Sequence, residues 1–155
     1  MMISRSVTFG AALVLLVPAF ALAQEKKITR SELPSAVEKT VAEQSRGASI
    51  RGFSQEKENG QTLYEAEMTV NGHSKDVTMD ANGQVVEVEE QVSLDSLSPA
   101  VRDGLHAKAG GGKIIKVESL TKKGNIVAYE AKVVTDGKRS EIQVDPDGKP
   151  LDHEE

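Results

Sequence analysis

Two segments of this 155-residue chain carry oxygen-bearing side chains at the spacing of a calcium-binding loop. Carboxylate and amide oxygens are the ligands that Ca²⁺ prefers, and the loop has a glycine at its sixth position. Loop positions three, five, six and twelve are held in one segment by Asp80, Asn82, Gly83 and Glu89, and in the other by Asp145, Asp147, Gly148 and Glu154. These segments are the candidate metal or small-ligand sites of the chain.

Both segments also have the composition of a hairpin turn. Thr78 and Gln143 stand at position one, where a calcium loop normally has a carboxylate. The flanking residues alternate in polarity, which is typical of strands rather than of the helices that flank a calcium loop. Asp, Asn and Gly are the residues that turns favour. A turn is therefore the favoured interpretation, and calcium or small-ligand binding is the alternative.

The chain has no constellation that is typical of an enzyme. His73, His106 and His153 have no second ligand at a metal-binding spacing. There is no cysteine, and no serine lies in a Gly-x-Ser-x-Gly elbow. Glu65 and Glu67 alternate with apolar residues and are expected to point into water, so they do not resemble a catalytic pair of carboxylates in different environments. We therefore predict a non-enzymatic protein without a cofactor.

The charge balance restricts the expected partners. The chain has 19 Lys and Arg residues against 24 Asp and Glu residues, a formal net charge of −5. Nucleic acids and anionic membrane surfaces attract basic proteins, so neither is an expected partner. Since there is no cysteine, disulfides cannot stabilise the fold, and packing must do so alone.

The N-terminus has the three parts of a secretory signal peptide. Arg5 supplies the positive charge, residues 7–20 form an apolar run, and Ala21 and Ala23 match the small residues of a cleavage site. The run is shorter than the ~20 residues that span a bilayer. We predict cleavage after Ala23, so that residues 1–23 are removed and no stable membrane anchor is left. The expected location is the periplasm or the outside of the cell.

The remaining chain repeats itself. A shift of 64 residues superposes identical residues of the first half on the second: Leu33 on Leu97, Ala36-Val37 on Ala100-Val101, Gly47 on Gly111, Ile50 on Ile114 and Gly60 on Gly124. After one extra residue, a shift of 65 superposes Tyr64-Glu65-Ala66 on Tyr129-Glu130-Ala131, Gly72 on Gly137, Asp80 on Asp145 and Gly83 on Gly148. The pattern predicts two tandem repeats, over residues 24–92 and 93–155.

Each repeat is expected to begin with a helix. Leu33, Val37 and Val41 recur at four-residue spacing in the first repeat, with Ser31 or Ser35 as the expected N-cap. Ser98 is the expected N-cap in the second repeat, where Pro99 suits the first helical turn. The glycines at 110–112 are expected to end that helix.

Four strands are expected after each helix. A leading strand contains Ile50 and Phe53 in the first repeat, and Ile115 and Val117 in the second. The later segments alternate strictly between apolar and polar residues and are separated by Asn-Gly, Asp-Gly and Asp-x-x-Gly turns, which favour hairpins. The predicted fold class is α+β, with two tandem repeats that each pack one helix on a four-stranded antiparallel meander sheet.

One face of each predicted sheet has no helix to cover it. Its residues are the polar partners in the alternation, with a few small or apolar ones among them. They are Leu63, Glu65, Glu67 and Thr69 in the first repeat, and Ala128, Glu130, Lys132 and Val134 in the second. A solvated outer face is the simpler interpretation, and a protein-binding surface is the functional one.

The repeated Tyr-Glu-Ala strand, the glycine hairpin and the Asp-x-x-Gly turn resemble the PepSY-like exported proteins, which are also described as β-lactamase-inhibitor-like. The resemblance covers residues 28–155. It implies a small exported protein that binds a protein or peptide, and the doubled inhibitors of this kind hold their enzyme against the open sheet faces. This chain differs from those inhibitors in having no cysteine and few aromatic residues. We therefore predict a protein or peptide partner in the cell envelope or outside the cell.

Overall fold

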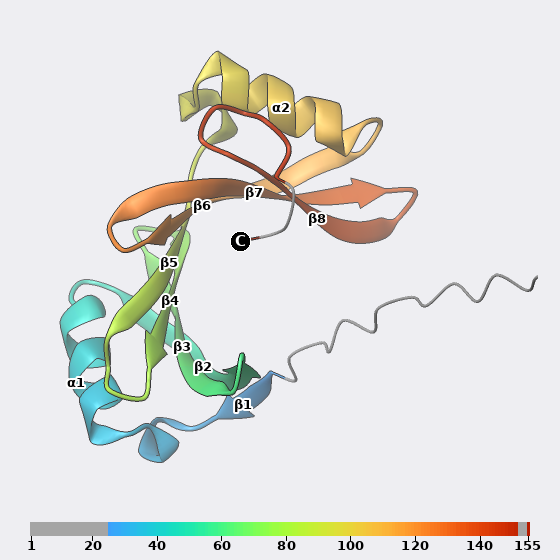
Figure 1. Ribbon diagram of the computed structural model, residues 1–155. Coiled ribbons are helices and arrows are strands. Elements are labelled where there is room, and N and C mark those ends of the chain that lie inside the picture. The colour runs from blue at the N-terminus through green and yellow to red at the C-terminus, as the bar shows by residue number, and fades with distance from the viewer. Residues whose placement is uncertain (1–24, 152–154) are drawn as a thin grey trace, which may run out of the picture.

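The protein forms one open antiparallel sheet with both α-helices of the described residues on the same side (Figure 1). The computed structural model describes residues 25–151 and 155, so the predicted signal peptide lies outside the described residues. Eight strands follow one another in chain order: β1 (Lys26–Ile28), β2 (Ser49–Glu58), β3 (Gln61–Val70), β4 (His73–Asp80), β5 (Val85–Gln91), β6 (Lys113–Lys122), β7 (Asn125–Thr135) and β8 (Lys138–Val144). The predicted α+β class and antiparallel meander are confirmed.

The two sheets expected from the sequence are joined. Strand β5 pairs with β6 in antiparallel register, with Glu89 opposite Leu120 and Gln91 opposite Glu118. The second half has three strands in the described residues, not the four expected, and Pro150 contributes only an isolated bridge to Val144. Proline has no N–H for a ladder, which agrees with the absence of a regular strand there.

Helix α1 (Ser35–Gln44) covers the first half, and α2 (Pro99–Ala109) covers the second half. Val37 and Val41 of α1 pack in a core with Ala66 and Met68 of β3. The core under α2 is separate and contains Val101, Leu105, Ala131, Val133 and Val144. Neither of these helices is long and apolar enough to cross a membrane.

The elements of the two halves are evenly spaced along the chain. Helix α2 begins 64 residues after α1, and β6 follows β2 by the same 64 residues at both ends. The short 3₁₀ helices at Arg30–Glu32 and Leu94–Ser96 obey this spacing too. Strands β2 and β6 each have a bulge after their first isoleucine, between Ile50 and Gly52 and between Ile114 and Lys116.

The second bulge decides which of the two adjacent isoleucines of β6 faces the core. Ile115 lies in the expected leading strand of the second repeat, and 47% of its surface is exposed. A bulge inserts one extra residue into a strand, so Ile114 and Lys116, two positions apart across the bulge, point to opposite faces. Ile114 and Val117 therefore pack toward the core under α2, while Ile115 points outward.

The two helices begin differently. The Ser98 hydroxyl accepts a hydrogen bond from the N–H of Val101 at 3.3 Å and Pro99 is the first helical residue, as predicted. Helix α1 begins at Ser35, so its N-cap is Pro34. Proline makes no side-chain cap, because its ring has no hydrogen-bond acceptor. The expected caps at Ser31 and Ser35 are therefore wrong.

We expect Ser98→Ala to lower the free energy of unfolding by about 1 kcal/mol, because it leaves a first-turn N–H without its acceptor. Ser35→Ala is the matched control and is expected to have almost no effect. Urea unfolding followed by circular dichroism measures both. Equal losses would contradict the difference in capping.

Candidate functional site

The eight predicted surface residues lie on one continuous face of the sheet. A row of directly opposed residues crosses five strands through Glu67, Asp76, Glu89, Leu120 and Ala128. Opposed residues on neighbouring strands point to the same side, so the row joins the polar face of β3 to that of β7. This surface, called the open face below, contains Leu63, Glu65, Glu67, Thr69, Ala128, Glu130, Lys132 and Val134, together with Asp76, Glu87, Glu89, Glu118, Leu120 and Gln143.

The open face lies on the inside of a bend in the sheet. Both helices pack on the other side, and the halves of the sheet turn their helix-free surfaces toward each other (Figure 1). The bend buries several residues that belong to neither core cluster. Leu63, Leu120 and Ala128 are at most 8% exposed, and Glu118 is 1% exposed. The simpler interpretation, a solvated outer face, does not hold for Leu63 and Ala128, because both are buried.

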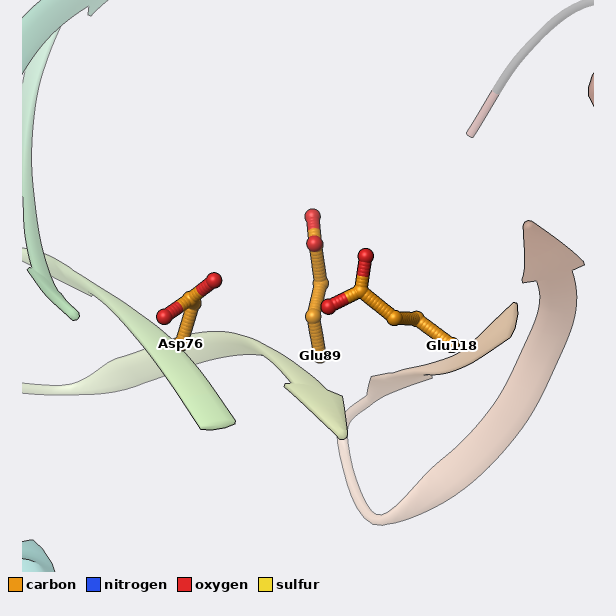
Figure 2. A group of neighbouring side chains, drawn as sticks. All are labelled: Asp76, Glu89 and Glu118. Carbon is orange, nitrogen blue, oxygen red and sulfur yellow. The ribbon is translucent and has the colours of Figure 1, made fainter. Parts of the chain in front are cut away.

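Three carboxylates from three neighbouring strands meet in the middle of this face. Asp76 of β4, Glu89 of β5 and Glu118 of β6 each offer an oxygen within 4.8 Å of the other two. Figure 2 shows the carboxylates of Glu89 and Glu118 side by side and that of Asp76 on the neighbouring strand. Within the described residues this is the one group of acidic or histidine ligands with such a geometry.

Two of the three carboxylates already have cationic partners. Arg51 Nη2 donates to Asp76 Oδ1 at 2.8 Å. Glu118 forms ion pairs with Lys116 and Lys132, and it accepts a hydrogen bond from the Ser74 hydroxyl at 3.0 Å. These contacts supply cationic and hydroxyl partners to a fully buried carboxylate. They engage Asp76 Oδ1 and both oxygens of Glu118, which a metal ion at this place would compete for.

The side chains of Glu89 and Glu65 are different, because neither carboxylate has a hydrogen bond or ion pair to another of residues 25–151 and 155. Burial, with the nearby charges of Glu130, Glu87 and Glu118, raises the pKa of Glu89 to about 8. Burial and the charge of Asp76 raise the pKa of Glu65 to about 7. At Glu65 the charge of Lys27 acts in the opposite direction, but burial outweighs it.

The second half contributes further polar groups. Gln143 Nε2 donates to Glu130 Oε2 at 3.0 Å, and burial raises the pKa of Glu130. Lys132 pairs with Glu141 at 3.0 Å. The main-chain N–H of Glu155 donates to Gln143 Oε1 at 2.8 Å, which places the C-terminal residue against this face (Figure 1). The open face as a whole is rich in carboxylates.

The candidate calcium segments are turns, and the structure does not bring the two together. Oδ1 of Asp80 accepts the N–H groups of Asn82 and Gln84 at 2.9 Å each. Oδ1 of Asp145 likewise accepts the N–H groups of Asp147 and Lys149. The Asp80 turn contacts α1, and the Asp145 turn contacts α2. These aspartates act as turn residues, and the geometry adds no support for calcium there.

Of the remaining sequence candidates, His73 and His106 are exposed, and His153 lies outside the described residues. Sequence reasoning did not find the grouping of Asp76 with Glu118 and Glu89. The alternation in β4 and β6 could have indicated that Asp76 and Glu118 point to the helix-free side. That these carboxylates lie close together depends on the pairing of β5 with β6.

No protein-family model and no curated protein matches this chain. Its fold is that of several solved structures from Bacteroides. A protein of Bacteroides eggerthii that is described as periplasmic has a TM-score of 0.61 and 17% identity, over 77% of this chain and 86% of that one. A DUF2874 family protein from Bacteroides ovatus has a TM-score of 0.58 and 23% identity, over 77% and 84% of the two chains.

A BLIP-like protein from Bacteroides fragilis also shares the fold. Its TM-score is 0.55 and its identity is 20%, over 77% of this chain and 83% of that one. At these identities the likeness establishes the architecture alone. The β-lactamase-inhibitor-like fold implied by the sequence resemblance is supported.

Proposed function

We propose that this is an exported, non-enzymatic binding protein that recognises a protein or peptide through its open face. The observation that carries the proposal is the helix-free surface inside the bend, with Glu65 and Glu89 partly buried and without cationic partners in the described chain. A solvated surface needs neither an enclosed shape nor uncompensated carboxylates. A partner that supplies positive charge would compensate them.

We also propose that the halves are tandem PepSY-like repeats, over residues 24–92 and 93–155. The constant spacing of helices, first strands and bulges supports a duplication. The doubled arrangement has a functional consequence, because the two open surfaces join into one and both halves contribute to the same binding face.

Export to the periplasm or the outside of the cell is part of the proposal. The N-terminal pattern with cleavage after Ala23 supports export. The Bacteroides eggerthii protein that shares the fold is described as periplasmic, which agrees with this location.

The proposal is tested by face-specific capture from an envelope extract. The double variant Glu65→Lys/Glu130→Lys reverses charge on both halves of the open face. Glu43→Lys/Asp103→Lys makes the same charge change on exposed positions of α1 and α2. We expect the wild type and the helix variant to retain the same partner, and the open-face variant to lose it by about tenfold or more.

Circular dichroism of all three proteins verifies that they are folded. Retention of the partner by the open-face variant, or equal loss from both variants, would show that the open face is not the binding surface. Absence of any partner retained by the wild type would also overturn the proposal.

A further inference from the structure

One end of the open face contains a pocket that both halves of the protein build. It has a volume of about 200 Å³. Leu63 of β3 and Val86 of β5 supply apolar walls, Glu56 of β2 and Glu87 of β5 supply carboxylates, and Lys122 comes from β6 of the second half. The pocket therefore depends on the pairing of β5 with β6.

The apolar part of the pocket is not an extension of the protein core. Leu63 is 8% exposed, yet it belongs to neither of the clusters under α1 and α2. It points to the helix-free side of β3, two residues from Glu65. Hydrocarbon entering this pocket would therefore gain contact with apolar surface without displacing a core side chain.

The polar part of the pocket has an excess of negative charge. Glu56, Glu58 and Glu87 line it together with a single cation, Lys122. Lys122 Nζ is 3.3 Å from Glu87 and is also paired with Glu155. The Glu56 side chain has no ion pair or hydrogen bond among residues 25–151 and 155. Burial and the charges of Glu58, Glu25 and Glu87 raise the pKa of Glu56, which indicates a carboxyl group that lacks a cation.

The side chains that match this combination are lysine and arginine. Both have an aliphatic stem that lies along apolar surface and a cationic head that seeks carboxylates. Leu63 and Val86 would contact the stem, and Glu56 would accept hydrogen bonds from the head. Further along the same face, Glu65 and Glu89 offer carboxylates to a second cation of the same ligand.

We propose that the pocket at Leu63, Glu56 and Glu87 binds a lysine or arginine side chain of a basic segment of the partner protein, and that this segment continues along the open face toward Glu89. The inference rests on the proposed function and specifies its partner as basic. The occupant is identified by the excess of carboxylates beside an apolar wall.

The test uses a fluorescent hexalysine peptide and the full chain at low ionic strength, with hexaglutamate as the peptide control. Glu56→Gln/Glu87→Gln removes two charges from the pocket. Glu43→Gln/Asp103→Gln removes two charges from the exposed helices and is the matched control. We expect hexalysine to bind, the pocket variant to bind it about tenfold more weakly, and the control to change affinity by less than about twofold. Salt is expected to weaken the binding.

The same variants are then used in the partner capture. We expect Glu56→Gln/Glu87→Gln to retain less partner than Glu43→Gln/Asp103→Gln, and hexalysine to displace the partner from the wild type. Equal weakening of hexalysine binding in both variants, or no binding, would show that the pocket has no specific role. If Glu65→Lys/Glu130→Lys loses the partner while the pocket variant keeps it, the proposed function stands and the pocket inference is wrong.

Discussion

Gly148→Ala is expected to lower the free energy of unfolding by about 3 kcal/mol or more, because a side chain there has no space and no favourable backbone conformation. Gly148 has a φ of +81°, and a Cβ at this position would lie 2.0 Å from the carbonyl oxygen of Ala100. A Cβ on Gly104 would in turn lie 2.0 Å from the carbonyl oxygen of Gly148. The turn after β8 and helix α2 are therefore in direct backbone contact.

Gly137→Ala is the matched control for this prediction. Gly137 also has a positive φ, of +76°, but a Cβ there would have no atom within 4 Å. Its replacement is expected to lower the free energy of unfolding by about 1 kcal/mol, because alanine disfavours the positive φ. Urea unfolding of both variants, followed by circular dichroism, measures the difference. Similar losses for the two would show that α2 does not rest on the turn.

Glu89→Gln is expected to stabilise the protein at pH 8.5 and to leave its stability nearly unchanged at pH 4.5. The pKa of Glu89 is raised to about 8 in the folded state, mainly by burial, against an ordinary value of 4.5. The folded state therefore holds a proton that the unfolded state releases between these pH values. The contribution of Glu89 to the free energy of unfolding is therefore fully present below pH 4.5 and is lost as the pH rises to about 8.

Glutamine resembles the protonated carboxyl group and does not ionise. The expected gain at pH 8.5 is on the order of 2 kcal/mol, a value reduced from the full pKa difference because water reaches part of the side chain. Glu43→Gln, on the exposed surface of α1, is the control and is expected to give no such difference between the two pH values. Thermal unfolding at both pH values provides the measurement. A gain of equal size at both would show that ionisation of Glu89 is not its cause.

This pH dependence bears on the proposed function. A basic segment bound beside Glu89 and Glu65 would favour their charged forms and remove the unfavourable desolvation. Binding is therefore expected to be stronger at pH 8.5 than at pH 6. At pH 6, binding is expected to release protons from Glu65 and Glu89. The direction follows from the raised pKa values of both groups.

The periodicity of the sequence determined the local structure of the protein. Alternation in β3 and β7 assigned Glu65 and Glu130 each to the helix-free face of its own repeat, because side chains of a strand point to opposite sides in turn. The four-residue spacing of Val37 and Val41 indicated the helix that covers the other face. Turn residues such as Asp80 marked the ends of the strands, since their side chains bond to their own backbone.

Tertiary structure alone decided how these elements meet. The pairing of β5 with β6 joins the halves across a connection that contains α2, and no local pattern specifies a contact between such distant segments. That pairing brings Glu89 to Glu118 and places Lys122 in the pocket beside Leu63. Burial on a helix-free face arises from the bend of the whole sheet, so the raised pKa of Glu89 is a property of the assembled fold rather than of the strand.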